Sequence, residues 1–397
     1  MRAVAKTREP RSAVSAPQHK WQTMRTRVHR IPASAPDDVD GIRTLVAAGQ
    51  LDPKAIVAIL GKTEGNGCVN DFTRGFASTT LTRMIADYTG EPLDAVERRV
   101  ALVMSGGTEG GLSPHWLVFE VVAADSAPHD GSTSLAVGAA ITRPFLPHEI
   151  GRAAQIAATA DAVREAMERA KINSPDDVHY VQVKCPLLTK ARVAEALAAG
   201  HSVATDDTLK SMADSRGASA LGVALALGEC GAGAIGDEVV CRDVALFSRR
   251  ASTSAGVELL ENQVLVIGNS TAWSGDLVIA HDVMADAIDT AALARVLGQL
   301  GIAATVPLAA EAQARIIAVL AKAEPSRSGV IRGDRHTMLD DSDISGTRHA
   351  RALVGGVLAG VLGTTTLFVS GGAEHQGPDG GGPLAIIARK PGADRSM

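Results

Sequence analysis

Lysine, arginine and serine recur in the same order three times along this 397-residue chain. In each set, the lysine follows an apolar run, the arginine opens an apolar helical run, and the serine ends or adjoins an apolar strand. The sets are Lys62/Arg74/Ser105, Lys184/Arg216/Ser254 and Lys322/Arg348/Ser370. The surrounding segments can be overlaid: TRGFASTTL, SRGASALGV and TRHARALVG around the arginines, and VMSGGTEG with FVSGGAEH around two of the serines. This recurrence predicts a triplicated unit whose polar side chains share one site, with a ligand of near-threefold symmetry.

These residue types suit acyl transfer. A serine hydroxyl is a poor nucleophile until a base removes its proton. A lysine can be that base only when neutral, and burial beside other cations favours the neutral form. Arginine stays charged and offers planar forked donors, which suit a flat ring bearing several carbonyl oxygens. Backbone N–H groups of the Ser-Gly turns at Ser105 and Ser370 can stabilise an oxyanion. The pattern therefore indicates hydrolysis of a cyclic amide or imide.

Each residue type taken alone has a simpler explanation. A serine before glycine is usually a turn or a helix cap, and a lysine at a strand end is usually solvated. What favours a shared site is that all three types recur together in the same order. A non-catalytic small-molecule binder on the same scaffold stays open as an alternative, and product formation would distinguish the two.

Other motifs are weaker. GKTEGNG, which begins at Gly61, lacks the order of a phosphate-binding loop. The glycine-rich segment GGAEHQGPDGGGP can bind a cation either through His375 or through backbone carbonyls, with Glu324 and Gln376 as side-chain partners.

Composition narrows the class of protein. The chain is 46% hydrophobic and 21% charged, as in globular proteins, and its net charge of −5 gives no reason to expect nucleic acid as a partner. The four cysteines form no CxxC pair and there is no secretory segment, so we expect a cytoplasmic protein. No apolar run is long enough to span a membrane.

Strand–helix–strand–helix–strand order predicts an α/β (α+β) fold of three repeated units around a pseudo-threefold axis, with sheets inside and helices outside. We define the expected units as unit A (28–128), unit B (133–271) and unit C (276–397). Residues 1–27 are basic and lack apolar periodicity. They are expected to be a disordered extension or a start assigned too early, with Met24 as the true start; a transit peptide or basic arm is the alternative.

Parts of the pattern are irregular. RIIAVLAKAE around Lys322 fits a strand or a helix equally well. Ser254 lies just before the strand NQVLVIGNS, so its placement is expected to differ from that of the other two serines. The helical segments after Arg216 and Arg348 are apolar nearly all round, which predicts that both are buried.

From 28 to 389 the chain resembles the cyanuric acid hydrolase/barbiturase family of ring-opening amidohydrolases, and more closely the cyanuric acid hydrolases. The strings that carry the resemblance are GKTEGNGCVNDFTR, VMSGGTEG, VQVKCPLLT, SRGASALG, RHTMLDDSDISGTRHAR and VSGGAEHQGPDGGGP. The resemblance implies ring opening of cyanuric acid to carboxybiuret, which loses carbon dioxide to give biuret, in s-triazine degradation. Barbiturase activity on a pyrimidine trione is the alternative.

The resemblance also implies roles for residues. Lys184 matches the catalytic lysine and Ser254 the nucleophile. The substrate-binding positions are Arg74, Arg216, Arg348, Ser105, Gly106, Ala255, Ser370, Gly371, Lys62 and Lys322. The metal loop matches Glu324, Ala373, Gln376, Gly377, Pro378 and Gly381. The implied metal is a structural magnesium ion and the implied assembly a homotetramer, with no organic cofactor.

Overall fold

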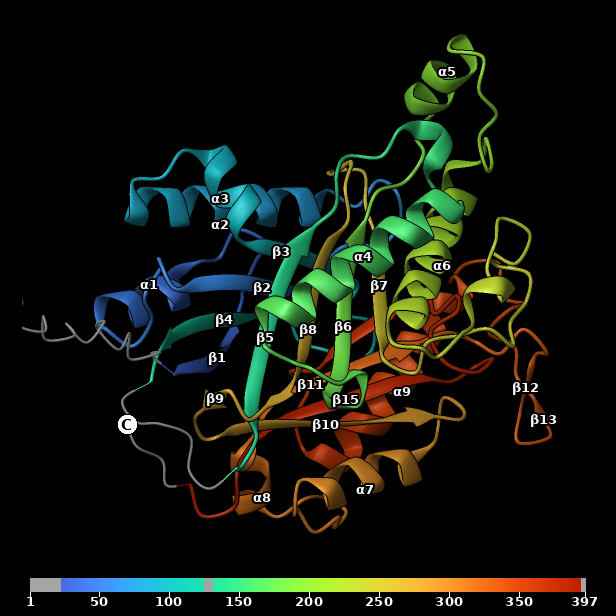
Figure 1. Ribbon diagram of the computed structural model, residues 1–397. Coiled ribbons are helices and arrows are strands. Elements are labelled where there is room, and N and C mark those ends of the chain that lie inside the picture. Colours follow the sequence, from blue (N-terminus) through green and yellow to red (C-terminus); the bar gives the residue numbers. More distant parts are fainter. Residues whose placement is uncertain (1–22, 125–130, 394–397) are drawn as a thin grey trace, which may run out of the picture.

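The computed structural model describes residues 23–124 and 131–393. It is a mixed α/β structure in which three sheets meet at the centre and helices cover their outer faces (Figure 1). Among the described residues, no helix is both long and apolar enough to cross a membrane.

Each unit contributes one sheet. That of unit A has the order β3-β2-β4-β1-β9, from Ala101–Gly106, Ile56–Thr63, His115–Ala123, Met24–Pro32 and Trp273–Ser274. That of unit B has the order β5-β8-β6-β7, from Ser134–Ile141, Gln263–Ser270, Val178–Cys185 and Ala251–Ala255. That of unit C has the order β10-β15-β11-β14, from Leu277–Met284, Gly382–Arg389, Ile316–Ala323 and Phe368–Gly371. Apart from β9, the three sheets have the same order: serine strand, lysine strand, an antiparallel strand, then the first strand of the unit.

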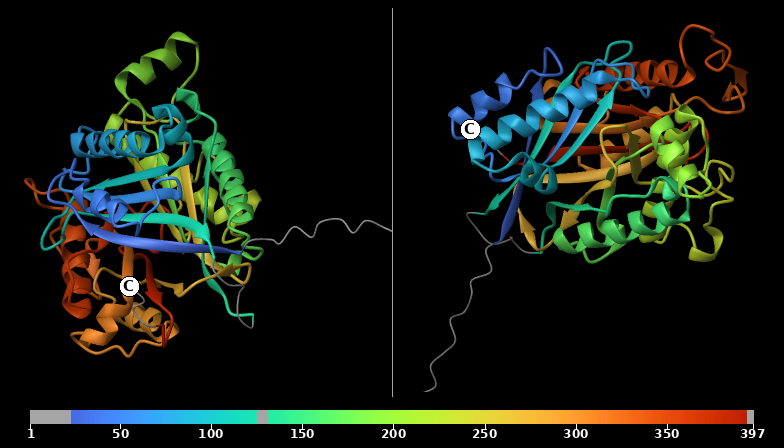
Figure 2. Two further views of the ribbon diagram at one scale, coloured as in Figure 1. Left: turned by 90° about the vertical axis from the view of Figure 1, so that its left-hand side faces the viewer. Right: turned by 90° about the horizontal axis from the view of Figure 1, so that it is seen from above.

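The helices lie outside the sheets, as the two rotated views show (Figure 2). Over unit A lie α1 (Asp40–Ala47), α2 (Phe72–Thr89) and α3 (Leu93–Arg99). In unit B, α4 (Ala153–Arg169) and α6 (Thr208–Ala226) pack against each other, while α5 (Lys190–Ala198) projects from the body. Unit C carries α7 (Thr290–Gln299), α8 (Ala310–Arg315) and α9 (Gly346–Leu362). Short 3-10 turns lie at Pro147–Glu149, Pro175–Asp177 and Ala232–Ala234, and β12 (Val330–Ile331) with β13 (Asp334–Arg335) forms a small hairpin.

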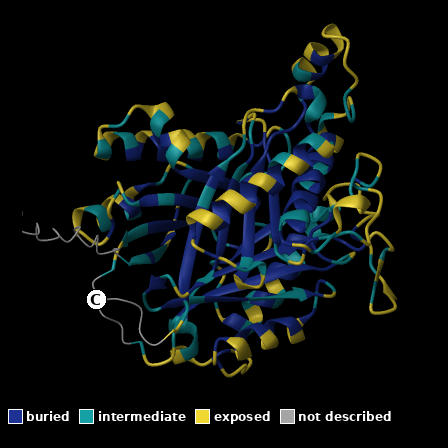
Figure 3. Ribbon diagram, in the orientation of Figure 1, coloured by how far each residue is buried: buried dark blue, intermediate teal, exposed yellow. Residues whose placement is uncertain are grey.

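The largest apolar cluster lies where the sheets meet. It includes residues of all three units, among them Leu60, Phe119, Val181, Leu320 and Ile387. These strands are runs of Val, Ile, Leu and Ala buried on both faces, as expected for strands covered by helices on one side and by other sheets on the other. Figure 3 shows this buried centre and the exposed outer faces of the helices. A rigid centre of this kind can hold polar side chains in fixed positions.

Several sequence expectations need correction. β1 begins at Met24, inside the basic region expected up to residue 27: residues 24–27 pair with β4, and residues 24 and 25 pair also with β9. The basic segment therefore ends inside a strand; its residues 1–22 lie outside the described part of the chain. The ambiguous segment around Lys322 is the strand β11. Ser254 lies in a strand, β7, as the other two serines lie in theirs. Its placement is therefore the same, because five residues are enough to pair with β6.

The helices also differ from expectation. α6 is buried nearly all round along its C-terminal two thirds, as predicted. α9 is buried on one face only, through Ala350, Arg351, Val354, Leu358 and neighbours, because nothing described covers its outer side. In unit B, a 3-10 turn precedes α4, and in unit C, α7 begins at Thr290, where Asp289 caps it.

Candidate active site

Strand pairing sets each lysine beside the serine of its own unit. In the parallel ladders, Lys62 is the partner of Ser105, Lys184 of Ser254 and Lys322 of Ser370. All six side chains are buried, with residue exposures of at most 7%. The same register in three sheets brings six polar groups to one place.

The three serines meet at the junction of the units. Ser370 Oγ lies 3.2 Å from both Ser105 Oγ and Ser254 Oγ. Behind them, Lys62 Nζ donates to Ser105 Oγ and Lys322 Nζ donates to Ser370 Oγ, each at a distance of 3.3 Å. Side chains from residues up to 265 positions apart in sequence therefore form one hydrogen-bonded cluster.

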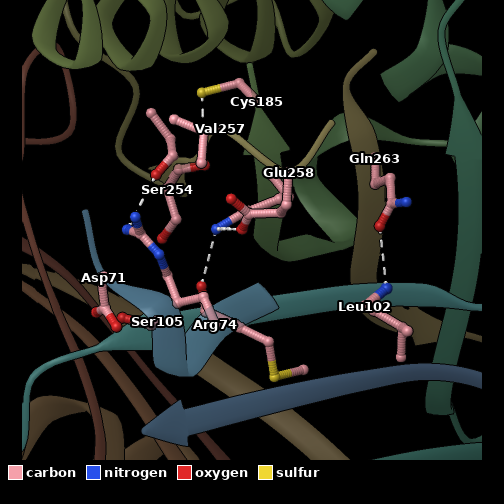
Figure 4. A network of polar contacts seen from close by, with 12 residues as sticks. Asp71, Arg74, Leu102, Ser105, Cys185, Ser254, Val257, Glu258 and Gln263 are labelled. Atoms are coloured by element: carbon pink, nitrogen blue, oxygen red, sulfur yellow. Dashed lines mark hydrogen bonds and ion pairs between the residues drawn. The ribbon is translucent and has the colours of Figure 1, made fainter. Parts of the chain in front are cut away.

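Lys184 has different partners. Its Nζ donates to the Met104 carbonyl oxygen (3.0 Å) and lies 2.8 Å from Glu258 Oε1. Figure 4 shows Glu258 and Ser254 on one side of this cluster, with Arg74 and Ser105 facing them. Among the described residues, Lys184 is the one of the three lysines with a carboxylate in ion-pair contact.

Arginines reach across from one unit to another. Arg74 Nη1 donates to the Ala255 carbonyl of unit B, and Arg216 of unit B forms two hydrogen bonds to Glu374 of unit C (2.8 and 2.6 Å). The third arginine that reaches the site is Arg351, which bonds Glu109 of unit A at 2.7 and 2.5 Å. These contacts run from A to B, B to C and C to A.

The structure does not bring Arg348 into the cavity. Its guanidinium donates to the Asn66 carbonyl and to Cys68 Sγ, on the loop before α2. Arg351 lies one helical turn further along α9 on the buried face, with 4% exposure. The segment TRHAR contains both arginines, and overlaying the Thr-Arg pairs of the three units selects Arg348. Arg348 and Arg351 are distinguished only by which face of α9 is buried.

A cavity opens onto the serines. Its lining contains Gly67, Arg74, Met104, Ser105, Gly106, Met212, Arg216, Ser254, Ala255, Arg351, Ser370 and Gly371. All but one of the predicted serine, arginine and paired backbone positions are thus together. The three lysines are not part of the lining and lie behind the serines. A ligand in this cavity would meet hydroxyls, guanidinium groups and strand-end N–H groups.

Local sequence positions these groups. Asp71 caps α2 by accepting from the Thr73 N–H, and it also accepts from the Gly67 N–H (2.8 Å), which fixes the loop beside Arg74. Gly107 has φ +104, and a side chain there would run into the Arg351 guanidinium. Glycine after Ser105–Gly106 therefore lets the turn pass close to an arginine.

The electrostatics of the site favour neutral lysines. Burial, and secondarily Arg351, lowers the pKa of Lys62 well below its ordinary value. Burial, with Arg216, lowers the pKa of Lys322 to about 7. Burial also lowers the pKa of Lys184, although Glu258 opposes this shift. A neutral amine is what a general base requires.

Sequence reasoning missed three carboxylates. A glutamate stands four residues after each serine, at Glu109, Glu258 and Glu374. Glu109 and Glu374 bind arginines of other units, and Glu258 binds Lys184. The shared pattern Ser-x-x-x-Glu was the signal that could have found them.

The predicted metal loop surrounds a second cavity. Glu324, Ala373, Gly377 and Pro378 line it together with Glu374. Burial and the neighbouring Glu374 raise the pKa of Glu324, so a cation would relieve the cost of its charge. One buried carboxylate with backbone carbonyls is a donor set that suits a hard divalent ion.

Other residues of this loop are used internally. Gln376 Oε1 accepts from the Thr253 N–H (2.7 Å), and the Gly381 N–H donates to the Pro378 carbonyl. His375 accepts from the Cys241 N–H at one ring nitrogen and donates to the Leu246 carbonyl from the other. This favours carbonyls and Glu324 over His375 as cation ligands. Among the described residues, no group of three or more His, Cys, Asp or Glu side chains is arranged to hold a metal.

Comparison with known proteins agrees with this geometry. Residues 27–389 match the model of the amidohydrolase ring-opening protein family. A cyanuric acid amidohydrolase of Ectopseudomonas oleovorans is 57% identical over 92% of this chain and 100% of its own length. One of Azorhizobium caulinodans is 58% identical over 92% of this chain and 98% of its own length.

Solved structures agree as well. A cyanuric acid hydrolase described as an evolutionary innovation by structural concatenation superposes with a TM-score of 0.89, at 52% identity, over 92% of this chain and 100% of that one. The hydrolase from A. caulinodans superposes with a TM-score of 0.85, at 54% identity, over 93% of this chain and 99% of that one. This chain therefore belongs to the family of ring-opening amidohydrolases.

Proposed function

We propose that this protein hydrolyses cyanuric acid to carboxybiuret, which then loses carbon dioxide to give biuret, as a step of s-triazine degradation. The observation that carries the proposal is the meeting of Ser105, Ser254 and Ser370 in one cavity, each beside a buried lysine. Relatives more than 50% identical along nearly the whole chain bear the name of that activity. A ring with three equivalent carbonyls suits a site with three equivalent serines.

The proposal includes a pseudo-threefold axis that passes between the three serines. The equal strand order of the sheets and the cyclic arginine contacts support it. Each ring carbonyl would then face one serine and the backbone N–H groups beside it, at Gly106, Ala255 or Gly371. Arg74, Arg216 and Arg351 would orient the ring, with Arg351 in the place that the sequence assigned to Arg348.

The chemistry would proceed through an acyl-enzyme. Neutral Lys184 accepts the proton of Ser254, whose Oγ attacks the nearest ring carbonyl. Backbone N–H groups stabilise the oxyanion of the tetrahedral adduct. The C–N bond breaks as the Lys184 ammonium returns the proton to the departing ring nitrogen. Lys184 then takes a proton from water, whose oxygen attacks the acyl carbon; as the bond to Ser254 Oγ breaks, the Lys184 ammonium returns the proton to Oγ, which restores the serine and the neutral lysine. Ser105 and Ser370 bind the other two carbonyls.

Lys184 must approach Ser254 for this step. The register places the two residues side by side, while Lys184 Nζ bonds Met104 and Glu258. Catalytic hydrogen bonds are often long or unformed without substrate, so this arrangement is compatible with Lys184 as the base.

The remaining expectations concern the assembly. A magnesium ion would be held by Glu324 and carbonyls of the loop that includes Ala373, Gln376, Gly377, Pro378 and Gly381. Its charge would stabilise the buried Glu324 and Glu374 carboxylates. It would thereby also stabilise the pairing of Glu374 with Arg216. We also propose a homotetramer, which the family resemblance implies, and a cytoplasmic location, which the cysteine usage favours.

The decisive experiment is product analysis by mass spectrometry after incubation with cyanuric acid or barbituric acid. Biuret from cyanuric acid, at a rate well above ring opening of barbituric acid, is the expected result. Faster opening of barbituric acid would indicate a barbiturase. Saturable binding of either ring without product would indicate a binding protein and contradict the proposal.

A further inference from the structure

The three Ser-x-x-x-Glu glutamates do not make equivalent contacts. Glu374 accepts from Arg216 Nε and Nη2, and Glu109 accepts from Arg351 Nε and Nη2. Both are two-bond pairs between planar groups, the strong form of an arginine–carboxylate contact. The same position in unit B, Glu258, would by analogy bind Arg74.

Glu258 instead binds the lysine of its own unit. Its Oε1 lies 2.8 Å from Lys184 Nζ. Arg74 turns to the carbonyls of Ala255 and Cys68, and its buried Nε has no hydrogen-bond partner among the described residues. Nε is the atom through which Arg216 and Arg351 bind their glutamates. The unpartnered Nε of Arg74 thus shows that the third arginine–glutamate pair is not formed, because the Glu258 carboxylate binds Lys184 instead.

This exchange makes Lys184 a better proton acceptor than its two counterparts. Lys62 and Lys322 donate to hydroxyl and carbonyl oxygens. All three lysines have both an arginine and carboxylates nearby, with Glu109 near Lys62, Glu374 near Lys322 and Arg74 near Lys184. Among the described residues, however, only Lys184 of the three is in direct contact with a carboxylate, so a proton added to Lys184 would be shared with Glu258. Burial raises the pKa of Glu258, but charged Lys184 and Arg74 lower it to about 2, and Arg74 continues to favour the carboxylate when Lys184 is neutral.

We propose that Glu258 is the positioning residue that selects Lys184 as the base, by breaking the equivalence of the three lysine–serine pairs. When the Ser254 hydroxyl gives its proton to Lys184 Nζ, the ammonium is held by Glu258 and by the Met104 carbonyl. When the ring nitrogen departs, that proton leaves Lys184 and Glu258 stays ionised throughout. This proposal rests on the proposed function, because it assumes that Ser254 and Lys184 carry out the chemistry.

The test compares Glu258→Gln, Glu258→Asp and the matched control Glu109→Gln in kcat, KM and pH profile on cyanuric acid. Besides Glu258, the charged or titratable groups that act on Lys184 are Arg74 from α2 and Cys185 from β6. Glu258→Gln removes the carboxylate and leaves burial and Arg74, which both lower the Lys184 pKa. The acidic limb of kcat/KM, which reports loss of the neutral base, should therefore move to lower pH.

The expected loss in Glu258→Gln is on the order of 10²-fold in kcat, with KM changed only a few-fold. Glu258→Asp keeps the charge, so part of kcat and of the limb position should return. Glu109→Gln frees Arg351, which faces the ligand, and should raise KM without moving the limb. An acidic limb that stays in place in Glu258→Gln would overturn the proposal, and so would a kcat loss in Glu109→Gln as large as that in Glu258→Gln.

Ser254→Ala separates this proposal from the function on which it rests. Full turnover in Ser254→Ala would overturn the assignment of the nucleophile. An inactive Ser254→Ala together with an unmoved limb in Glu258→Gln would overturn the role of Glu258 alone. Circular dichroism and thermal melting establish folding, and if Glu258→Gln is unfolded, the profile of Glu258→Asp decides by the same criterion.

Discussion

The lysine–serine pairs of units A and C differ from that of unit B in their contacts, although strand order and register are the same. Lys62 and Lys322 donate to their own serines, whereas Lys184 binds Glu258 and the Met104 carbonyl. Equal backbones thus carry unequal electrostatics. Three bases in one small site cannot all gain protons, because each proton repels the next. A repeated scaffold can therefore assign the chemistry to one copy by moving a single carboxylate.

The strongest way to break this comparison is to remove the serines one at a time. Ser254→Ala should lower kcat by at least about 10³-fold, because the acyl-enzyme cannot form. Ser105→Ala and Ser370→Ala should mainly raise KM, since they would lose a contact to a carbonyl that does not react. Steady-state kinetics on the three variants, with melting curves as the folding check, test this. A larger kcat loss in Ser105→Ala than in Ser254→Ala would place the nucleophile in unit A.

The lysines give the next largest difference. Lys184→Met should lower kcat on the order of 10²- to 10⁴-fold, because methionine fills the space but accepts no proton. Lys62→Met and Lys322→Met should keep most of kcat. In the wild type, kcat/KM should rise with pH through the Lys184 pKa, which burial places below the ordinary lysine value. If Lys322→Met loses as much kcat as Lys184→Met, the lysine–serine pairs act together, and the chemistry is not confined to the pair of unit B.

The two arginines of TRHAR sharpen the comparison at the level of binding. Arg351→Lys should raise KM by about tenfold, because a point charge replaces a fork that bonds Glu109 and faces the cavity. Arg348→Lys should change KM by less than about threefold, since its contacts are with the loop at Asn66 and Cys68. Isothermal titration calorimetry with a non-hydrolysed ring analogue should show the larger loss of binding affinity in Arg351→Lys and the smaller loss in Arg348→Lys. An Arg348→Lys defect larger than that of Arg351→Lys would restore the assignment made from sequence.

How far sequence alone could lead is clear from particular residues. The lysines, the serines, Arg74 and Arg216 could be predicted because each lies at the beginning or the end of a recognisable apolar strand or helix. The mixed α/β class followed from the order of those elements. Arg351 could not be distinguished from Arg348, since the choice depends on which face of α9 is buried.

The carboxylates illustrate a different limit. Glu109, Glu258 and Glu374 share a spacing, so their recurrence was visible. Their partners were not, because Arg351 and Arg216 reach them from other units, more than 150 positions away in sequence. The difference between Glu258 and its two counterparts exists only in three dimensions.

The smallest expected effect concerns the glycine-rich loop that follows the serine of unit C, which is longer than the matching glycine-rich segment SGGTEGG after Ser105. If a divalent ion neutralises Glu324 and Glu374, chelation should lower the melting temperature by roughly a few degrees, and added Mg²⁺ should restore it. Glu324→Gln should lose this response, because the amide carries no charge to bind the ion. Activity should fall mainly through KM, since Arg216 depends on Glu374 while the pair of Lys184 and Glu258 is untouched. A chelated protein whose melting temperature and KM are unchanged would show that the Arg216–Glu374 pair is stable without a metal, although burial and Glu374 raise the pKa of Glu324.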